Sequence, residues 1–111
     1  QSPFLVAMIE HINALNELEK ILEVKELDAI LIGPYDLSSS MNLTGKFEDQ
    51  KFLDVMKEIK AKADNAKVPC GVHVVEPNES EFNKKLDEGY RFIPYSIDAV
   101  VLQKYIRNPK L

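Results

Sequence analysis

The 111-residue sequence has a single cysteine, no tryptophan and no long apolar run. Cys70 cannot form an internal disulfide, which suits a reducing compartment, and we expect a cytoplasmic protein. No stretch approaches the roughly 20 apolar residues of a membrane span, and no signal-peptide pattern is present. The net charge is −4 and no basic stripe occurs, so neither membrane nor nucleic acid is an expected partner.

Several motifs that carry common chemistries are also missing. The sequence has no P-loop, no G-x-G-x-x-G and no G-x-S-x-G, so nucleotide binding and serine hydrolysis lack support. The chain begins at Gln1, directly before an apolar run, which we interpret as the start of a piece of a longer protein.

What is present is an alternation of apolar runs and amphipathic segments. Each run is short and bounded by turn residues, as expected of buried parallel strands. The predicted strands are Phe4–Ile9, Leu27–Ile32, Val68–Val75 and Tyr90–Tyr95. The predicted helices are residues 13–24, 49–65, 78 or 80 to 88, and 96 or 98 to 107, with Asn108-Pro109 ending the last one.

This β-α-β-α-β-α-β-α order predicts an α/β fold in which all strand carboxyl ends meet on one side of a parallel sheet. Four βα units could form an open doubly wound domain or half of a (β/α)₈ TIM barrel. The missing start favours the half-barrel, so residues 1–111 are interpreted as one partial domain, the second half of such a barrel.

Two acidic residues follow consecutive predicted strands. Glu10 ends the first strand, and Asp36 follows the second by four residues, at the start of a predicted loop over residues 34–48. Sequential parallel strands are usually neighbours, so the two carboxylates can converge. They could bind a hard cation, Mg²⁺ or Mn²⁺, that a 2-oxo acid also chelates. They could equally cap the helices that follow them.

Other polar residues near the strand ends have two interpretations. Gly33 allows close approach of a ligand, and the backbone N–H groups of Tyr35 and Asp36 could hold a carboxylate. His73 could carry a proton or act as a ligand, although a histidine on a buried strand is more often a satisfied core residue. His11 is expected to point away from Glu10, because successive side chains alternate along an extended segment.

The pattern resembles the HpcH/HpaI aldolase family, the metal-dependent class II aldolases of 2-oxo-3-deoxy acids. The resemblance lies in an apolar strand ending in glutamate (Val6–Glu10), the helix ALNELEKIL and the segment LDAILIGPYDLSSSMNLTG. GVHVV (Gly71–Val75) and EGYRFIPYSIDA (Glu88–Ala99) resemble the seventh and eighth strands of the family's barrel. The Ile-Gly-Pro-x-Asp-Leu-Ser core is the specific part.

The resemblance implies a lyase that cleaves 2-oxo-3-deoxy acids or diacids to pyruvate and an aldehyde. It implies that Glu10 and Asp36 bind a divalent metal, Mg²⁺ or Mn²⁺ with Co²⁺ as a further candidate. It also implies that Gly33, Pro34, Tyr35 and Asp36 bind the substrate. Met8 and His11 depart from the family pattern, which has glutamine and a small hydroxyl residue there.

The family's enolate-stabilising arginine and proton-transferring histidine belong to the first half of the barrel, so this half provides no catalytic residue. We expect the isolated chain to bind metal weakly and to be weakly active or inactive. Both outer predicted strands are apolar and unguarded, which predicts a homo-oligomer. The alternatives are a lyase of acyl-CoA thioesters and a non-catalytic flavodoxin-like binding or interaction domain.

Overall fold

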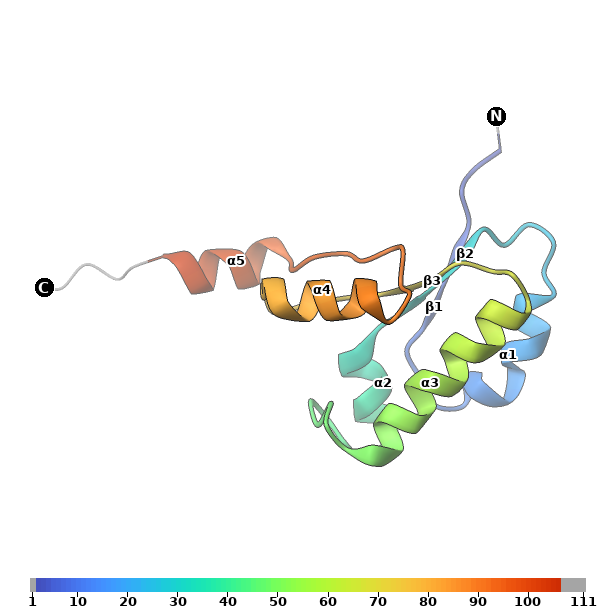
Figure 1. Cartoon of the computed structure of the whole chain (residues 1–111), viewed down its shortest axis with the longest axis horizontal. Coiled ribbons are helices and arrows are strands. Elements are labelled where there is room, and N and C mark those ends of the chain that lie inside the picture. The colour runs from blue at the N-terminus through green and yellow to red at the C-terminus, as the bar shows by residue number, and fades with distance from the viewer. Residues whose placement is uncertain (1, 107–111) are drawn as a thin grey trace, which may run out of the picture.

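The computed structural model describes residues 2–106 and has an α/β fold built on a parallel sheet (Figure 1). The strands are β1 (Val6–Ile9), β2 (Ala29–Ile32) and β3 (Cys70–Val72). They lie side by side in that order, with Ile9 opposite Ile32 and Ile32 opposite Val72. The first three predicted strands are confirmed, although each is shorter than its apolar run.

Four helices form where the sequence predicts them. They are α1 (Ala14–Leu22), α3 (Gln50–Asn65), α4 (Glu79–Asp87) and α5 (Asp98–Tyr105). Asp49 caps α3 by accepting a hydrogen bond from Lys51 N at 2.9 Å, and Asn78 caps α4 by accepting one from Glu81 N at 3.2 Å.

The start of α5 differs from the prediction. Neither Ser96 nor Asp98 is its cap, because Ile97 occupies that position without a side-chain bond. Ser96 instead lies in a left-handed turn with φ of +61°, and its N–H is bonded to the carbonyl of Val74. The predicted end of the helix, Arg107, and the Asn108-Pro109 stop lie outside the described residues.

The segment after β2 corrects the prediction of a loop over residues 34–48. A short helix, α2 (Pro34–Ser40), begins directly after the strand, and turns follow it. Pro34 takes the first helical position, where its missing N–H is not needed. The buried Ser38 hydroxyl donates to the carbonyl of Tyr35 and accepts from Gly45 N, which ties the helix to the turns.

The fourth predicted strand forms only in part. The segment 90–96 runs parallel to β3 but makes two isolated bridges, Gly71 with Phe92 and Val74 with Tyr95. The Phe92 carbonyl accepts a hydrogen bond from Val72 N at 3.0 Å. The next bond of a parallel ladder would require an N–H at position 94, and Pro94 has none. This explains why the pairing is interrupted.

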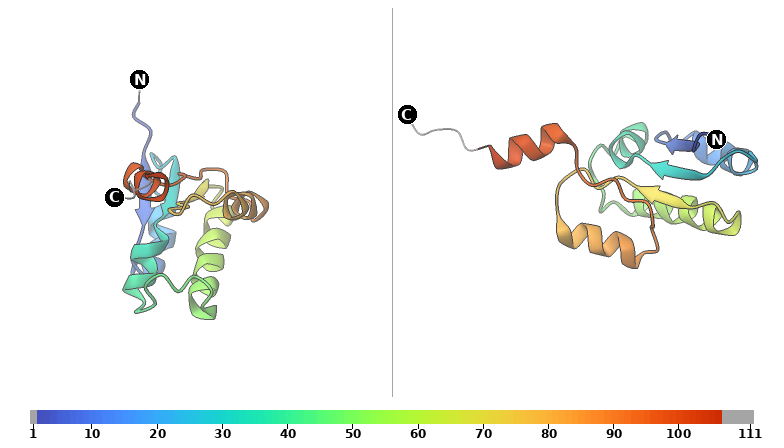
Figure 2. Two further views of the ribbon diagram at one scale, coloured as in Figure 1. Left: turned by 90° about the vertical axis from the view of Figure 1, so that its left-hand side faces the viewer. Right: turned by 90° about the horizontal axis from the view of Figure 1, so that it is seen from above.

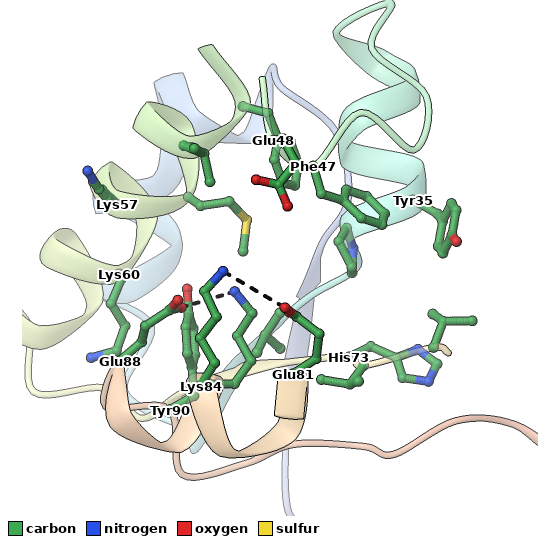
Figure 3. A pocket seen from close by; sticks show the side chains of 18 of the residues that line it. Tyr35, Phe47, Glu48, Lys57, Lys60, His73, Glu81, Lys84, Glu88 and Tyr90 are labelled. Atoms are coloured by element: carbon green, nitrogen blue, oxygen red, sulfur yellow. Dashed lines mark hydrogen bonds and ion pairs between the residues drawn. The ribbon is translucent and has the colours of Figure 1, made fainter. Parts of the chain in front are cut away.

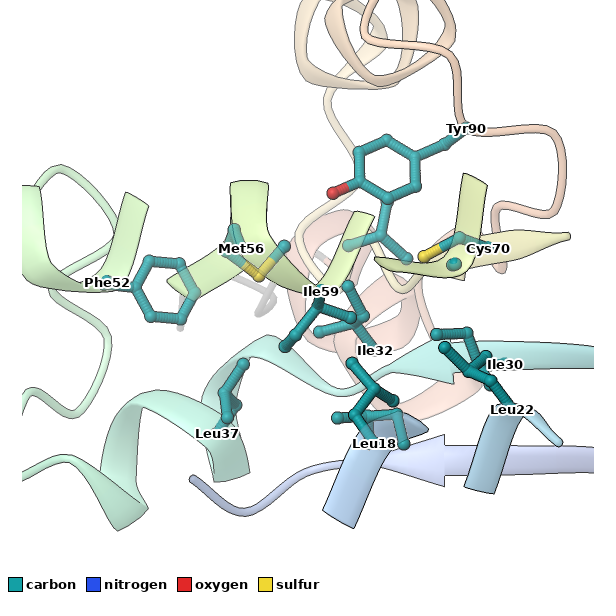
Figure 4. Packing of buried hydrophobic residues seen from close by; sticks show 13 residues of the cluster. Leu18, Leu22, Ile30, Ile32, Leu37, Phe52, Met56, Ile59, Cys70 and Tyr90 are labelled. Carbon is teal, nitrogen blue, oxygen red and sulfur yellow. The ribbon is translucent and has the colours of Figure 1, made fainter. Parts of the chain in front are cut away.

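One face of the sheet is covered by α1 and α3, and this side holds the core (Figure 4). The sheet contributes Ile9, Ile30, Ile32 and Val72; α1 contributes Leu18 and Leu22; α3 contributes Phe52, Met56, Ile59 and Ala63. The apolar stripe predicted for α3 is therefore confirmed. Each such side chain stabilises the fold by about 1.5–3 kcal/mol when fully buried. The packing of α1 and α3 on the sheet therefore holds the strands, and the residues that follow them, in place.

Helices α4 and α5 lie outside this core, and neither has a buried residue. Figures 1 and 2 show α5 extending away from the sheet. Lys104 of α5 donates a hydrogen bond to the carbonyl of Pro77, and the rings of Phe82 and Tyr95 meet edge to face at 5.6 Å. Among residues 2–106 no helix is both long and apolar enough to cross a membrane.

Candidate functional site

A hollow of about 420 Å³ lies at the carboxyl end of the sheet, where β1 and β2 end. Glu10 follows β1 directly, and Asp36 lies in the first turn of α2, which follows β2. Its lining residues are Glu10, His11, Asp36, Ser39 and Ser40. The two acidic residues that the sequence singles out therefore share one cavity.

Neither carboxylate acts as a hydrogen-bonded helix cap. The capping position of α1 is Asn13 and that of α2 is Gly33, and neither helix has a side-chain cap bond. Within residues 2–106, the carboxylates of Glu10 and Asp36 take part in no hydrogen bond and no ion pair. The capping interpretation thus loses its support, and both carboxylates are free to bind a ligand.

Gly33 stands between the two acidic segments. Its N–H donates to the Ile9 carbonyl, which joins β2 to β1 just before Glu10. A Cβ on Gly33 would lie 3.4 Å from Glu10 Cβ and from Met8 Cε, and 3.7 Å from Glu10 Oε2. A side chain at position 33 would therefore meet Glu10 and Met8 at ordinary contact distance, and the φ of −96° does not require glycine either.

Serine side chains that sequence reasoning overlooked hold the site together. The Ser40 hydroxyl accepts a hydrogen bond from Ile12 N at 2.8 Å and donates to the Leu37 carbonyl at 2.7 Å. This pair of bonds joins α2 to the turn after Glu10. The signal in the sequence was the run of three serines after Asp36-Leu37, a composition that favours side-chain to backbone bonds over plain helix.

The first turn of α2 presents free backbone donors. The first intrahelical bond runs from Leu37 N to the Gly33 carbonyl, so the N–H groups of Tyr35 and Asp36 have no helical acceptor. The side chains of Pro34 and Tyr35 line a different cavity, described below. Of the four residues predicted to bind substrate, only Asp36 lines the acidic hollow.

The histidines differ from expectation in one case. His11 lines the hollow beside Glu10, although the sequence predicted that it would point away. Its Nδ1 accepts a hydrogen bond from Asn13 N at 3.1 Å, because the chain turns before α1 instead of continuing as a strand. His73 is half-buried, and its Nε2 lies 3.0 Å from the Ser96 carbonyl, as expected of a satisfied structural histidine.

A second, larger cavity of about 770 Å³ lies between α3, α4 and β3 (Figure 3). Its apolar wall includes Phe52, Met56, Val72, Val74 and Tyr90. Three of its acidic residues are paired with lysines: Asp64 with Lys60, Glu81 with Lys84, and Glu88 with Lys85. These pairs neutralise most of its charge, so the larger cavity is a poorer cation site than the acidic hollow.

The donor set of the hollow fits a hard divalent cation. Carboxylate oxygens are the ligands that Mg²⁺ and Mn²⁺ prefer, and such ions keep several coordination positions for water or substrate. In residues 2–106 no three His, Cys, Asp or Glu side chains gather closely enough to enclose a metal ion. An ion held by Glu10 and Asp36 would therefore have an open coordination sphere.

Parallel strands alternate with helices, and acidic residues follow the carboxyl ends of two strands. These features define an α/β protein with the fold of half of a (β/α)₈ barrel. The chain belongs to the HpcH/HpaI aldolase/citrate lyase family, because the model of that family matches residues 1–104.

Individual relatives agree with this assignment. The hydroxypyruvate/pyruvate aldolase of Paraburkholderia phytofirmans is 30% identical over 106 residues, which are 93% of this chain and 39% of that protein. The 4-hydroxy-2-oxovalerate aldolase of Novosphingobium aromaticivorans is 29% identical over 100 residues, covering 90% and 36% of the two chains. This chain thus spans well under half the length of these relatives.

A solved structure carries the same fold. The crystal structure of the HpcH/HpaI aldolase from Desulfitobacterium hafniense superposes with a TM-score of 0.84 at 28% identity. The match covers 92% of this chain and 39% of that one. The chain therefore has the fold of half of a barrel.

Proposed function

We propose that this chain forms the metal-binding half of a lyase that cleaves 2-oxo-3-deoxy acids or diacids to pyruvate and an aldehyde. The observation that carries the proposal is the pair of unpaired carboxylates, Glu10 and Asp36, in one hollow beside two neighbouring parallel strands. Family membership and the names of its relatives, which are aldolases of short 2-oxo acids, support it.

In this proposal Glu10 and Asp36 hold a divalent metal, Mg²⁺, Mn²⁺ or Co²⁺. When bound, the metal polarises the 2-oxo group and stabilises the negative charge that develops as the carbon–carbon bond breaks. The backbone N–H groups of Tyr35 and Asp36 hold the substrate carboxylate, and Gly33, which lies between β2 and this turn, contacts the substrate through its backbone. Pro34 fixes the start of the turn that presents these donors.

The overall reaction is a retro-aldol cleavage. The C4 hydroxyl of the substrate loses its proton, the C3–C4 bond breaks to release the aldehyde, and C3 takes up a proton to give pyruvate. No lysine or arginine lines the hollow to stabilise the developing charge. We therefore assign metal and substrate binding to this half, and no cationic side chain that stabilises the developing charge.

The test is calorimetric titration of the chain with Mn²⁺ in the presence of oxalate, an inert analogue of the pyruvate enolate. We expect Mn²⁺-dependent oxalate binding that Asp36→Ala weakens at least about tenfold, as loss of a charged metal ligand should. Asp87→Ala is the matched control, because Asp87 is also an exposed helical aspartate but lies outside the hollow. Equal binding by wild type and Asp36→Ala would contradict the proposed site.

A further inference from the structure

One ring nitrogen of His11 is engaged and the other is free. Nδ1 accepts a hydrogen bond from Asn13 N at 3.1 Å, so it carries no proton. The proton of the neutral imidazole is therefore on Nε2. Among residues 2–106, Nε2 has no hydrogen-bond partner. Because His11 lines the acidic hollow, this cavity contains an unused N–H donor.

The backbone around His11 is fixed before any ligand binds. Its carbonyl accepts a hydrogen bond from Ala14 N at 2.9 Å, and Ile12 N donates to the Ser40 hydroxyl at 2.8 Å. The first bond closes the turn before α1, and the second joins that turn to α2. A donor that is held in place in this way loses little conformational entropy on binding. His11 is also exposed, so its ring is accessible to a ligand.

The position of His11 decides which part of a substrate it meets. In the proposed function, on which this step rests, the backbone of Tyr35 and Asp36 on α2 holds the substrate carboxylate, and the metal between Glu10 and Asp36 holds the 2-oxo group. His11 belongs to the other segment, since it follows Glu10 after β1, the strand beside β2. A substrate that extends from α2 across the metal therefore directs its aldehyde half, the part beyond C3, toward His11.

The free Nε2–H selects what that half must carry. It can donate to an oxygen atom, but it cannot accept a hydrogen bond or bind a cation while it holds its proton. A carboxylate is the strongest acceptor, because the hydrogen bond is then charge-assisted. A methyl group at the same place removes water from the N–H and provides no hydrogen bond in return, which weakens binding.

We propose that His11 is a specificity-determining residue, whose Nε2–H donates to a carboxylate in the aldehyde half of a 2-oxo acid bound at Glu10 and Asp36. The preferred substrates are then 2-oxo diacids, and the aldehyde released from them carries a carboxylate. His11 gives up no proton in this role. It binds the substrate and leaves the proton transfers of the retro-aldol reaction to other groups.

Calorimetric titration in saturating Mn²⁺ tests the proposal with two ligands of equal chain length. 2-Oxoglutarate ends in a carboxylate and 2-oxovalerate in a methyl group, and neither has the C4 hydroxyl that cleavage requires. We expect the wild type to bind 2-oxoglutarate at least about tenfold more tightly. His11→Asn should remove this preference, because its Oδ1 still accepts from Asn13 N whereas its amide does not reach the position of Nε2.

His11→Gln is the matched control that separates the donor from the turn. Its amide N–H lies near the position of Nε2, but it has no acceptor near that of Nδ1, so it should keep the preference for 2-oxoglutarate. Oxalate has no aldehyde half and should bind equally to all three proteins. Equal affinity of the wild type for the two longer ligands, a preference that survives His11→Asn, or one that His11→Gln also loses would each overturn the proposal.

Oxalate also separates this proposal from the proposed function. If Asp36→Ala weakens Mn²⁺-dependent oxalate binding but the wild type shows no preference between the longer ligands, the role of His11 alone is refuted. If oxalate does not bind at all, both proposals are refuted.

Long-range ¹H–¹⁵N NMR of the wild type with Mg²⁺ needs no variant. It should show a protonated Nε2 and a bare Nδ1 for His11, and an Nε2 resonance that shifts with 2-oxoglutarate but not with oxalate. A bare Nε2, or a resonance that both ligands shift equally, would contradict the assigned role.

Discussion

At the scale of single residues, Ser40 controls how the two acidic segments lie relative to each other. Ser40→Ala leaves Ile12 N without its acceptor and frees α2 from the turn after Glu10. We expect a stability loss of about 1 kcal/mol in urea unfolding. We also expect Mn²⁺–oxalate affinity to fall about tenfold in calorimetry, as is typical when a supporting hydrogen bond is lost.

Ser39→Ala is the control for this prediction. Ser39 lines the same hollow and is exposed, but it makes no hydrogen bond through its side chain in the described part of the chain. It should change neither stability nor affinity appreciably. If both serine variants behave alike, the Ser40 bonds do not position the site.

Cys70 makes stability depend on pH in the alkaline range. Burial in the core raises the pKa of its thiol to about 12, partly offset by the nearby Lys60 ammonium. An unfolded chain ionises its cysteine near pH 8.5. The unfolded state therefore holds fewer protons above that pH, so this contribution is complete below about pH 8.5 and is lost as pH rises toward 12.

We therefore expect the free energy of unfolding to fall between pH 8.5 and 10, by up to about 1.4 kcal/mol per pH unit. Urea unfolding at several pH values measures it, and Cys70→Ala should flatten the slope. Burial also raises the pKa of Tyr90, but an unfolded tyrosine ionises only near pH 10, so this window isolates the thiol. An unchanged slope in Cys70→Ala would show that other groups cause it.

At the scale of helices and strands, the sequence predicts where an element lies along the chain better than how long it is or whether a segment is a helix or a loop. The period of Phe52, Met56, Ile59 and Ala63 marks the buried side of α3 unambiguously, because one apolar stripe meets one sheet face. α2 escaped prediction because Gly33, Pro34 and three serines are typical of loops. Its helical turn depends on side-chain bonds made at Ser38 and Ser40.

The fourth strand shows a different limit. Its apolar pattern, YRFIPY, is correct for a strand, and the segment does lie beside β3. Pro94 faces β3 in the ladder, where its missing N–H removes a bond, and a proline facing the free edge would not have done so. Which side a residue faces depends on the register between strands, which one sequence does not reveal.

At the scale of the whole molecule, the order of βα units predicted a parallel α/β fold but left an open doubly wound domain and half of a barrel as alternatives. The family resemblance favoured the half-barrel, and the comparisons confirm the family and the fold. The convergence of Glu10 and Asp36 followed from the rule that consecutive parallel strands are neighbours. The position of His11 did not follow, because it depends on the turn through residues 11–13.

The half-barrel also limits catalysis, and this leads to a prediction for the whole chain. The acidic hollow contains two carboxylates, a histidine and two serines but no lysine or arginine, so charge on the cleaving substrate lacks a cationic side chain. With Mn²⁺ and 4-hydroxy-2-oxovalerate, we expect pyruvate release below about 0.01 s⁻¹, roughly a thousandfold under a typical enzyme. Coupled reduction of the pyruvate measures it. Asp36→Ala reveals contaminating activity, because a rate that survives this substitution does not come from the proposed site. A wild-type rate above about 1 s⁻¹ that Asp36→Ala abolishes would mean that this half supplies the full catalytic machinery.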